Sequence, residues 1–474
     1  MFSIIDLKNI ICMNKLFLLG LPILYLGCFS PQIYKTVGKI SKKQSIATII
    51  NDSGLKTNIG IKAVSLKSGK TIYELNSASL FNPASNNKLY SAIAALSILD
   101  TSFTFKTSVY REDDKVFLVG GGDPDLKINT LDSLSEIVSK KFPSTKRIFL
   151  DDTITDSLVY GPGWMWDEGD EWYSAEISGL SVNDNCIDFI ISPTLPGSLI
   201  SVETYPKSNY YKIDNSAMTV SDTSEYDKIK IIRDWKNKKN IFQISGTMMD
   251  TSSVDTLIRN ISNPTMFTGN LFNQMLVDKG LQIIELKKGV YNGEGLPIAI
   301  HHSKPLLSSL ENLMVESDNL TAELLVKMIG HKTARNQGNW QNGLFAMKIF
   351  LNDHIGIDTS TFSISDGSGV SRYNYSSPSH FTDLLVWAYN NPKIKDNFLE
   401  ILSTTSDKET LRDRNLPDGV FAKTGSLSGV TTFSGYILNS KSEPIAFSIL
   451  MNGFKGSSAP YRKLQDTIVS MLSQ

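Results

Sequence analysis

The sequence has 474 residues, of which 41% are hydrophobic and 20% are charged, and its formal net charge is −1. This composition is typical of a globular chain that is long enough for two or three domains with a large core. The near-zero net charge, without a long basic run, argues against nucleic acid as a partner.

The N-terminal region carries a predicted export signal. Residues 16–27 form an apolar run that is too short to span a bilayer and has the length of a signal-peptide core. Cys28 follows in a setting that resembles a bacterial lipoprotein processing site, although the usual leucine three places before the cysteine is missing. We expect residues 1–27 to be a signal peptide, with either lipidation of Cys28 or plain cleavage nearby. The start is left open between Met1 and Met13.

The cysteines and histidines predict no metal centre. Three cysteines are present, and if Cys28 is lipidated and the leader is removed, Cys186 is left alone. Neither a disulfide framework nor a cysteine-based metal site can then form. The five histidines lack a ligand spacing such as His-Glu-x-x-His.

The first folded stretch, residues 46–73, reads as a helix followed by two strands that meet at a turn over residues 67–70. Residues 81–100 come next, with a turn signal at Asn82-Pro83 and then an apolar run with helical spacing. Ser85 opens this predicted helix, and Lys88 lies three residues later on the same face. The pair is a nucleophile beside a candidate base.

The Ser-x-x-Lys spacing alone is a weak signal. It also occurs at Ser53 and Lys56, in a polar turn before a strand-like run. Considered by itself, Ser85 would be interpreted as a helix N-cap followed by a solvated lysine. The helix dipole at Ser85 nevertheless favours developing negative charge, which the turn at Ser53 does not offer.

The middle of the chain, from about residue 107 to 298, changes to short alternating strands separated by Gly, Pro, Asn and Asp. One long helix is predicted there, over residues 265–279, after Asn263-Pro264 and before Gly280. Helical patterns return from residue 301, and two strands and a final helix close the chain. The predicted helices are 305–315, 319–329, 340–351, 381–390 and 461–472, and the predicted strands are 430–438 and 445–451.

Helix and strand signals at both ends and a β-rich middle predict one discontinuous α/β domain with an insertion. The expected division is 41–107 and 298–474 for the catalytic domain and 108–297 for one or more inserted β-rich domains.

Two further motifs follow Ser85 in order. Ser317-Asp318-Asn319 lies between two helical runs, and Lys423-Thr424-Gly425 precedes the strand at 430–438. Each motif is ordinary alone. The order Ser-x-x-Lys, Ser-x-Asn, Lys-Thr-Gly is a strong signal for an active-site serine acyl-transferase of the penicillin-recognising type.

The chemistry explains the first pair of residues. The hydroxyl of Ser85 attacks a carbonyl only when a base takes its proton, and Lys88 can do so when it is neutral. A free lysine has a pKa of about 10.4, so the site must lower the pKa of Lys88. We expect burial and a second cation, Lys423, to do this.

The second motif would move protons and orient groups. We expect Ser317 to pass a proton toward the leaving amine and Asn319 to hold Lys88 and the substrate amide. Asp318 is interpreted as a helix-start or surface residue.

The third motif would bind substrate. Lys423 and Thr424 would bind the free carboxylate at the end of the substrate, and Gly425 would let the strand approach closely. The backbone N–H groups of Ser85 and Ser426 would form an oxyanion hole, in which one donor typically contributes about 3 kcal/mol.

The three motifs, PASNNKL at 83–89, ESDNLTAELL at 316–325 and AKTGSLSGV at 422–430, resemble those of the penicillin-binding proteins. The long separation of the first two motifs is similar to that in the low-molecular-mass class C members, the D-alanyl-D-alanine carboxypeptidase/endopeptidases. The resemblance runs from about Ile46 to the C-terminus and includes four further stretches: 120–126, 161–185, 301–310 and 365–378.

This resemblance implies an α/β penicillin-binding (serine β-lactamase-like) catalytic domain, discontinuous, with inserted β-rich domains. It implies a periplasmic hydrolase of peptidoglycan stem peptides that needs no metal or organic cofactor, and β-lactam antibiotics would acylate Ser85. The balance of carboxypeptidase and endopeptidase action, the diamino acid of the stem peptide, anchoring to a membrane through a lipid on Cys28 and formation of a homodimer are left open.

Two other classes compete with this interpretation. A class A β-lactamase would need a Glu-x-x-Leu-Asn segment shortly after the middle motif, and none is present. A catalytically weak wall-binding lipoprotein of the same fold would not need every hydroxyl, amine and amide of the three motifs, yet all are present.

Overall fold

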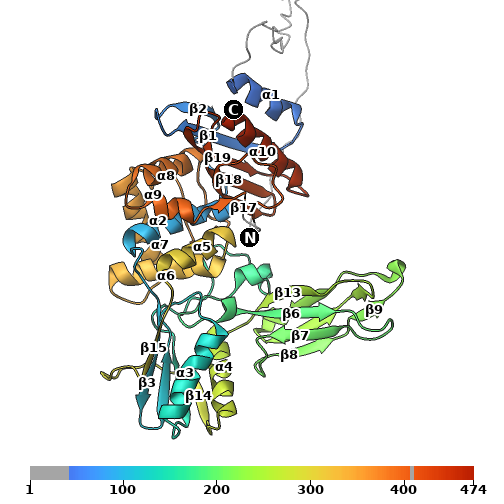
Figure 1. Ribbon diagram of the computed structural model, residues 1–474, viewed down its shortest axis with the longest axis vertical. Coiled ribbons are helices and arrows are strands. Elements are labelled where there is room, and N and C mark those ends of the chain that lie inside the picture. Colours follow the sequence, from blue (N-terminus) through green and yellow to red (C-terminus); the bar gives the residue numbers. More distant parts are fainter. Residues whose placement is uncertain (1–41, 406–409) are drawn as a thin grey trace, which may run out of the picture. The chain divides into compact units, whose positions relative to one another are not determined.

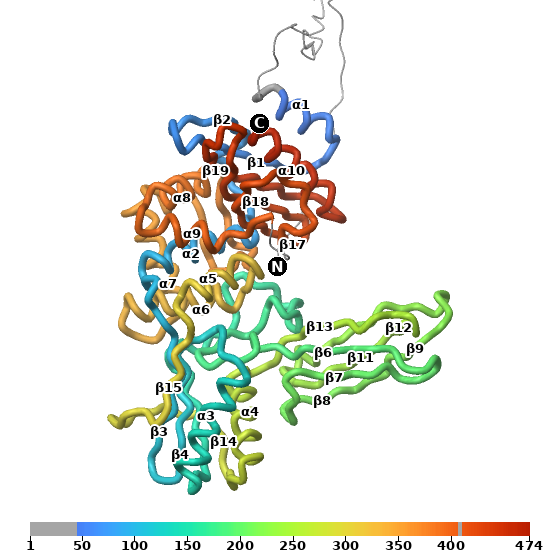
Figure 2. Tube along the Cα trace, in the orientation of Figure 1, coloured from blue at the N-terminus to red at the C-terminus, as the bar shows by residue number. Residues whose placement is uncertain are grey.

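The computed structural model describes residues 42–405 and 410–474, so the predictions for residues 1–27 and Cys28 lie outside the described residues. Figure 1 shows the chain as a ribbon and Figure 2 as a Cα tube. Within the described part of the chain, no helix combines the length and apolar character needed to cross a membrane.

The sheet that carries the third motif is built from both ends of the chain. Within the described residues it has six strands in the order β16-β17-β18-β19-β1-β2 (Figure 1). β1 pairs antiparallel with β19, from Asn58 opposite Asn452 to Ser65 opposite Ile445. This pairing joins the two ends, as a discontinuous domain requires. The strands are β1 (Asn58–Ser65), β2 (Thr71–Leu75), β16 (Ser403–Thr404), β17 (Val420–Leu427), β18 (Val430–Leu438) and β19 (Pro444–Asn452).

Helices cover both faces of this sheet. On one face, α1 (Lys42–Asp52) and α10 (Ala459–Ser473) pack against the apolar residues of β1, β18 and β19. On the other face lies a helical core that includes the nucleophile helix α2. The helices predicted after residue 301 are confirmed with small shifts of their ends, and α9 is an addition. This second group is α2 (Lys88–Ile98), α5 (Leu306–Val315), α6 (Asn319–Ala334), α7 (Trp340–Phe350), α8 (Pro378–Asn390) and α9 (Lys395–Glu400).

The middle of the chain has its own hydrophobic core, formed by residues between Val109 and Ala299. A five-stranded sheet, in the order β14-β5-β4-β3-β15, packs with α3 and α4, and the strands of three smaller sheets lie between β5 and α4 in the sequence. The larger sheet and its helices are β3 (Lys106–Glu112), β4 (Lys115–Val119), β5 (Arg147–Asp151), β14 (Glu285–Lys288), β15 (Ala299–His302), α3 (Ile128–Lys141) and α4 (Pro264–Asp278). The smaller sheets contain β6 (Cys186–Ser192), β7 (Ser201–Tyr205), β8 (Lys212–Asn215), β9 (Met218–Val220), β10 (Lys230–Arg233), β11 (Ile241–Ser245), β12 (Thr247–Met249) and β13 (Asp255–Asn260).

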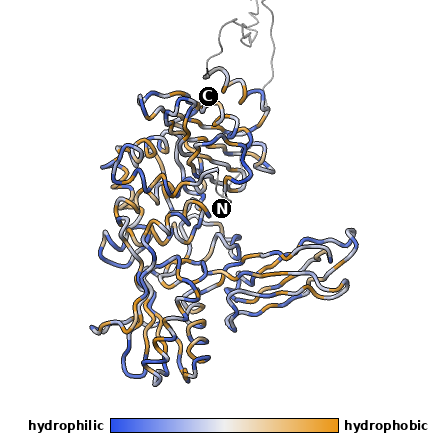
Figure 3. The backbone as a smooth tube through the Cα atoms, in the orientation of Figure 1, coloured by the Kyte–Doolittle hydropathy of each residue, from blue (hydrophilic) through white to orange (hydrophobic). Residues whose placement is uncertain are grey.

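Helix α3 was not predicted. The buried side of this helix includes Leu131, Leu134 and Val138. The rest of the helix is rich in Ser, Thr, Asn and Asp. The buried apolar residues recur at helical spacing, so the sequence carried an amphipathic signal that the prediction of a β-rich insertion passed over. Figure 3 shows the wider pattern, in which apolar residues follow the strands and packed helices while many connecting turns are hydrophilic. The predicted domain boundaries stay a prediction, which the separate core of the middle region supports.

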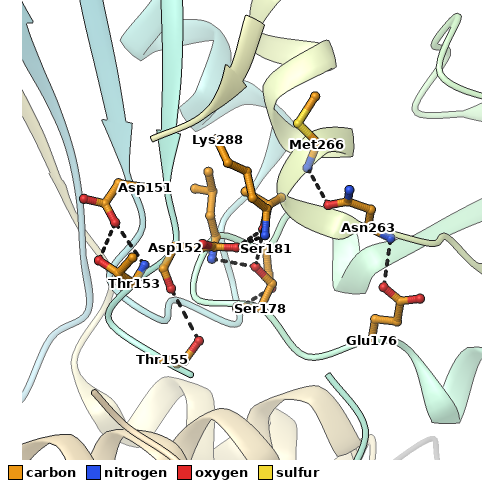
Figure 4. Close-up of polar contacts among 12 residues, drawn as sticks. Asp151, Asp152, Thr153, Thr155, Glu176, Ser178, Ser181, Asn263, Met266 and Lys288 are labelled. Carbon is orange, nitrogen blue, oxygen red and sulfur yellow. Dashed lines mark hydrogen bonds and ion pairs between the residues drawn. The ribbon is translucent and has the colours of Figure 1, made fainter. Parts of the chain in front are cut away.

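Helix α4 begins as its sequence predicted, with Asn263 as the N-cap and proline in the first turn. Thr265 Oγ1 donates to Asp152 Oδ2 at 2.5 Å, and Lys288 Nζ contacts the same oxygen at 2.5 Å (Figure 4). The backbone N–H of Asn263 donates to Glu176 Oε2 at 2.9 Å. These contacts tie the start of α4 to the end of β5 and to the segment 161–185.

Candidate active site

The nucleophile lies in a short turn before its helix. Ser85 belongs to a 3₁₀ turn, Ala84–Asn87, and α2 begins at Lys88, so Ser85 is not itself the N-cap of α2. Ala84 has a φ of +46°, in the left-handed region that non-glycine residues seldom adopt, and its N–H donates to Asn82 Oδ1 at 2.9 Å. A strained backbone next to the nucleophile is a feature of functional sites.

The ammonium of Lys88 is fully buried and has three acceptors. Its Nζ donates to Ser85 Oγ at 3.2 Å, to Asn319 Oδ1 at 2.5 Å and to the carbonyl of Ser368 at 2.9 Å. The structure therefore brings the nucleophile, the candidate base and the amide of the middle motif together.

Burial lowers the pKa of Lys88 from 10.5 to about 8, because the buried site disfavours the charged form. The charges of Asp318, Asp366 and Glu323 oppose this effect and keep the pKa from falling further. A lysine with such a pKa is neutral in a useful fraction of molecules near neutral pH, as a general base requires.

Lys423 is equally buried, but among the described residues its Nζ donates to a single acceptor, the neighbouring carbonyl of Thr424, at 3.2 Å. Burial lowers the pKa of Lys423 well below 10.5, and the charge on Lys88 lowers it further. From the sequence, burial and the charge of Lys423 were expected to lower the pKa of Lys88 together. The structure assigns that lowering to burial, and the repulsion between the two lysines acts on Lys423.

The third motif lies on β17 beside the nucleophile turn. Gly425 is opposite Thr432 of β18, and a Cβ added at Gly425 would come within 2.9 Å of the Ser85 backbone nitrogen and 2.2 Å of Thr432 Oγ1. The predicted close approach at this glycine is confirmed. Thr424, Gly425 and Ser426 line a cavity of about 740 Å³. The strand itself was not predicted, because a Lys-Thr-Gly-Ser run has little strand character.

The middle motif lies at the start of α6. Asp318 is the N-cap of this helix and accepts a first-turn N–H at 2.6 Å, which confirms its interpretation as a helix-start residue. Asn319 turns its oxygen to Lys88, and its Nδ2 donates to the carbonyl of Tyr173 at 2.7 Å. Ser317 has a φ of +62°, and its hydroxyl makes no hydrogen bond with any described residue. The structure thus leaves Ser317 unlinked to either lysine.

The two asparagines after Ser85 fix the nucleophile turn in place. The amide of Asn86 is oriented so that its nitrogen faces acceptors and its oxygen faces donors. It donates to the carbonyl of Lys423 at 3.0 Å and accepts from Ser434 Oγ at 2.6 Å. Asn87 Nδ2 donates to the carbonyl of Asp366 at 2.8 Å. The turn is therefore held between the strands β17 and β18 on one side and the loop after residue 365 on the other.

The loop at residues 365–378, named the rear loop here, supports the nucleophile turn and Lys88. This role was not predicted from the sequence. The buried carboxylate of Asp366 accepts from Ser371 N at 2.6 Å, Asn374 Nδ2 at 2.7 Å and Trp164 Nε1 at 3.0 Å. The carbonyl of Ser368 in this loop is one of the acceptors for Lys88. The density of Asp, Gly, Ser and Asn in the loop was the available signal, because these residues build hydrogen-bonded turns.

The segment 161–185, which belongs to the middle region of the chain, also contacts the site. Trp164 contacts the rear loop, and the carbonyl of Tyr173 holds Asn319. Other side chains of the segment face solvent, with Trp166 at 72% and Trp172 at 45% exposure. A cavity of about 370 Å³ lies between this segment and the start of α6.

Comparison with known proteins gives a consistent result. The family described as "D-Ala-D-Ala carboxypeptidase 3 (S13) family" matches residues 42–474. The D-alanyl-D-alanine carboxypeptidase of Actinomadura sp. (strain R39) is 30% identical over 492 aligned positions, which cover 96% of this chain and 88% of that protein. The D-alanyl-D-alanine carboxypeptidase DacB of Haemophilus influenzae is 24% identical and covers 84% of this chain and 86% of its own.

A solved structure supports the fold. Penicillin binding protein 4 (dacB) from Haemophilus influenzae superposes with a TM-score of 0.78 at 23% identity, over 90% of this chain and 99% of that one. The predicted fold class, a serine β-lactamase-like α/β domain with insertions, is confirmed.

Proposed function

Because this chain belongs to the D-Ala-D-Ala carboxypeptidase 3 (S13) family, we propose that it is a penicillin-sensitive serine carboxypeptidase/endopeptidase that cleaves peptidoglycan stem peptides. One observation carries the proposal. The buried Nζ of Lys88 donates to Ser85 Oγ at 3.2 Å, in a site that has the three motifs of the family in order.

The proposed reaction begins with attack of Ser85 Oγ on the carbonyl of the D-Ala-D-Ala bond while neutral Lys88 takes the hydroxyl proton. The C–N bond breaks, and the terminal D-Ala leaves as an amine after it receives a proton, for which we propose Ser317 as the relay. Water then hydrolyses the acyl ester on Ser85. Asn319 orients Lys88 and the substrate amide, in keeping with its contact to Lys88 Nζ.

Substrate recognition is proposed for β17. Lys423 and Thr424 would bind the terminal carboxylate, and the N–H groups of Ser85 and Ser426 would stabilise the oxyanion. The close packing of Gly425 against the Ser85 backbone supports this placement, because it brings the strand and the nucleophile turn within reach of one carbonyl oxygen.

The test is to incubate the purified protein with benzylpenicillin and to locate a covalent adduct by peptide mass mapping. We expect a penicilloyl group on Ser85 that is absent from the Ser85→Ala variant. A protein that stays unmodified and leaves the drug intact would contradict the proposal and favour the wall-binding alternative. Product analysis with a stem pentapeptide and with a cross-linked dimer would then measure carboxypeptidase and endopeptidase action separately.

We also propose the domain division 41–107 and 298–474 for the catalytic domain and 108–297 for the insertion.

For cellular location, we propose export to the periplasm with a lipid on Cys28 as the membrane anchor, supported by the apolar run at 16–27. Metabolic labelling with an alkyne fatty acid tests the anchor. Label is expected in the full-length chain and not in a Cys28→Ala variant, and equal labelling of both would reject the anchor.

A further inference from the structure

Glu323 is a buried carboxylate that the proposed reaction does not use. It lies on α6 with no solvent exposure. Its Oε2 accepts from Trp340 Nε1 at 2.6 Å and from Gly367 N at 2.9 Å, and its Oε1 accepts from Ser368 N at 2.8 Å. Both oxygens act only as acceptors, which is the pattern of an ionised carboxylate.

The peptide of Ser368 links Glu323 to the candidate base. Its N–H donates to Glu323, and its carbonyl accepts from Lys88 Nζ at 2.9 Å. The loop lies directly against α6, since a Cβ added at Gly367 would come within 2.5 Å of the carbonyl of Ala322. Glu323 therefore holds the one residue of this loop that contacts Lys88.

We infer that Glu323 is a positioning residue for the acyl transfer: it clamps Gly367 and Ser368, orients Lys88 toward Ser85, and supplies a negative charge that stabilises protonated Lys88. The inference rests on the proposed function. Glu323 touches neither the nucleophile nor, in the proposed reaction, the substrate, so it acts through Ser368.

The charges around Glu323 set the sign of its effect. Asp366 faces it from the rear loop, Lys88 from α2, and Lys327 from its own helix, where Lys327 is paired with Asp156 at 2.6 Å. Burial raises the pKa of Glu323 to about 7, and the charge of Asp366 adds to the rise. Above that pH the carboxylate is ionised and raises the pKa of Lys88. Removing its charge must therefore lower the pKa of Lys88.

The Glu323→Gln variant tests the inference, because it keeps the volume of the side chain but loses the charge and one acceptor. We expect the plateau rate of acylation by a β-lactam to fall by about 10-fold to 100-fold, through misplacement of Lys88. We also expect the acid limb of the pH–rate profile to move to lower pH. Trp340→Phe removes a donor and keeps the clamp, so its limb should stay at the wild-type position. Glu400→Gln, which removes an exposed charge from α9, controls for net charge.

A direct measurement separates this inference from the proposed function. The pKa of Lys88 is read from the 13Cε signal of labelled lysine, assigned with a Lys88→Met variant, in the wild type and in Glu323→Gln. A lower pKa in the variant supports the charge effect even if the protein forms no acyl-enzyme, which would reject only the proposed function. The inference would be overturned if the pKa of Lys88 is unchanged in Glu323→Gln. It would also be overturned if the acylation plateau and the acid limb of this variant match those of the wild type. Should Glu323→Gln fail to fold, Glu323→Asp takes its place, with a reduced plateau and an unmoved limb expected, and a wild-type plateau would overturn the clamp.

Discussion

The two buried lysines of the site lie in contrasting surroundings. Lys88 has three acceptors, Ser85 Oγ, Asn319 Oδ1 and the carbonyl of Ser368, and three carboxylates act on its charge. Lys423 has one carbonyl acceptor and a like charge nearby. Both are fully buried. Equal burial therefore does not mean equal proton affinity, because the acceptors and carboxylates around each amine decide where a proton resides.

The contrast assigns different tasks to the two amines. Lys88 binds a proton near neutral pH and releases it readily, which suits a base that must take and return the proton of Ser85. Among the described residues Lys423 has no carboxylate partner, so an incoming carboxylate would supply a counter-charge and stabilise its protonated form. The predictions below test this division, starting with the largest expected effect.

Replacing Lys88 removes the proposed general base. We expect Lys88→Met to lower the rate of acylation by benzylpenicillin by about 10³-fold to 10⁴-fold, the upper part of the range for loss of a general base. The measurement is the pre-steady-state rate of adduct formation on Ser85. Lys67→Met, which changes an exposed lysine paired with Glu443, is the matched control and should keep the wild-type rate. Retention of rapid acylation in Lys88→Met would assign the base to another group.

Replacing Lys423 should weaken substrate capture. In Lys423→Met we expect the kcat/KM for a stem peptide with a free terminal carboxylate to fall by about 10²-fold, mostly through KM. The acid limb of kcat/KM should stay at its wild-type position, because burial, and not the charge of Lys423, lowers the pKa of Lys88. An upward shift of the limb would show instead that Lys423 is charged in the free enzyme and lowers the pKa of Lys88.

The pH dependence of acylation in the wild type follows chiefly from Lys88. Acylation should rise about tenfold per pH unit up to a pH of about 8 and then level off, since only the neutral amine accepts the proton. The free energy of unfolding should also depend on pH through Lys88. The pKa of Lys88 is about 8 in the folded state and near 10.5 in the unfolded state, so the unfolded chain binds more protons between these values.

The wild type should therefore gain stability relative to Lys88→Met as the pH rises through that window. Denaturant unfolding of both proteins at pH 7.5 and at pH 10 measures the difference, and groups common to both cancel. A difference in unfolding free energy that does not change with pH would mean that the pKa of Lys88 is not lowered in the folded state.

The smallest expected effect comes from one carboxylate. Asp318→Asn keeps a good helix N-cap and removes one charge that raises the pKa of Lys88. We expect the acid limb of acylation to move down by roughly half a pH unit with an unchanged plateau. A limb that does not move would show that solvent screens Asp318 from Lys88.

The fold and the central site residues could be predicted because they leave local patterns. The turn at Asn82-Pro83 and the helical spacing after it located the nucleophile, and strand-like runs of residues located β18 and β19. Strand β17 gave a weak pattern, because its Lys-Thr-Gly-Ser run has little strand character, whereas the helical spacing of α3 was present but overlooked. A motif search could pair Ser85 with Lys88, since the 3₁₀ turn that leads into α2 places residues three apart on one side.

The supporting residues could not be found this way. Glu323, Asp366 and Ser368 act on Lys88 through contacts between segments far apart in the sequence. A glutamate within an apolar helix does not reveal from sequence whether it faces solvent or a backbone N–H group. The sequence predicted that burial and the charge of Lys423 lower the pKa of Lys88; burial does so and the charge of Lys423 does not contribute, which depends on the surroundings of each amine in the folded protein.

The pairing of β1 with β19 also has a consequence for biosynthesis. The segment with Ser85 is made early, whereas β17, β18 and β19 are among the last parts of the chain to leave the ribosome. The sheet cannot close until then, so the nascent chain carries its nucleophile without the strand that must lie beside it. Such long-range pairing makes folding slow and leaves apolar faces open in the meantime. The serine therefore gains the strand beside it only after β17, β18 and β19 have been made and have paired.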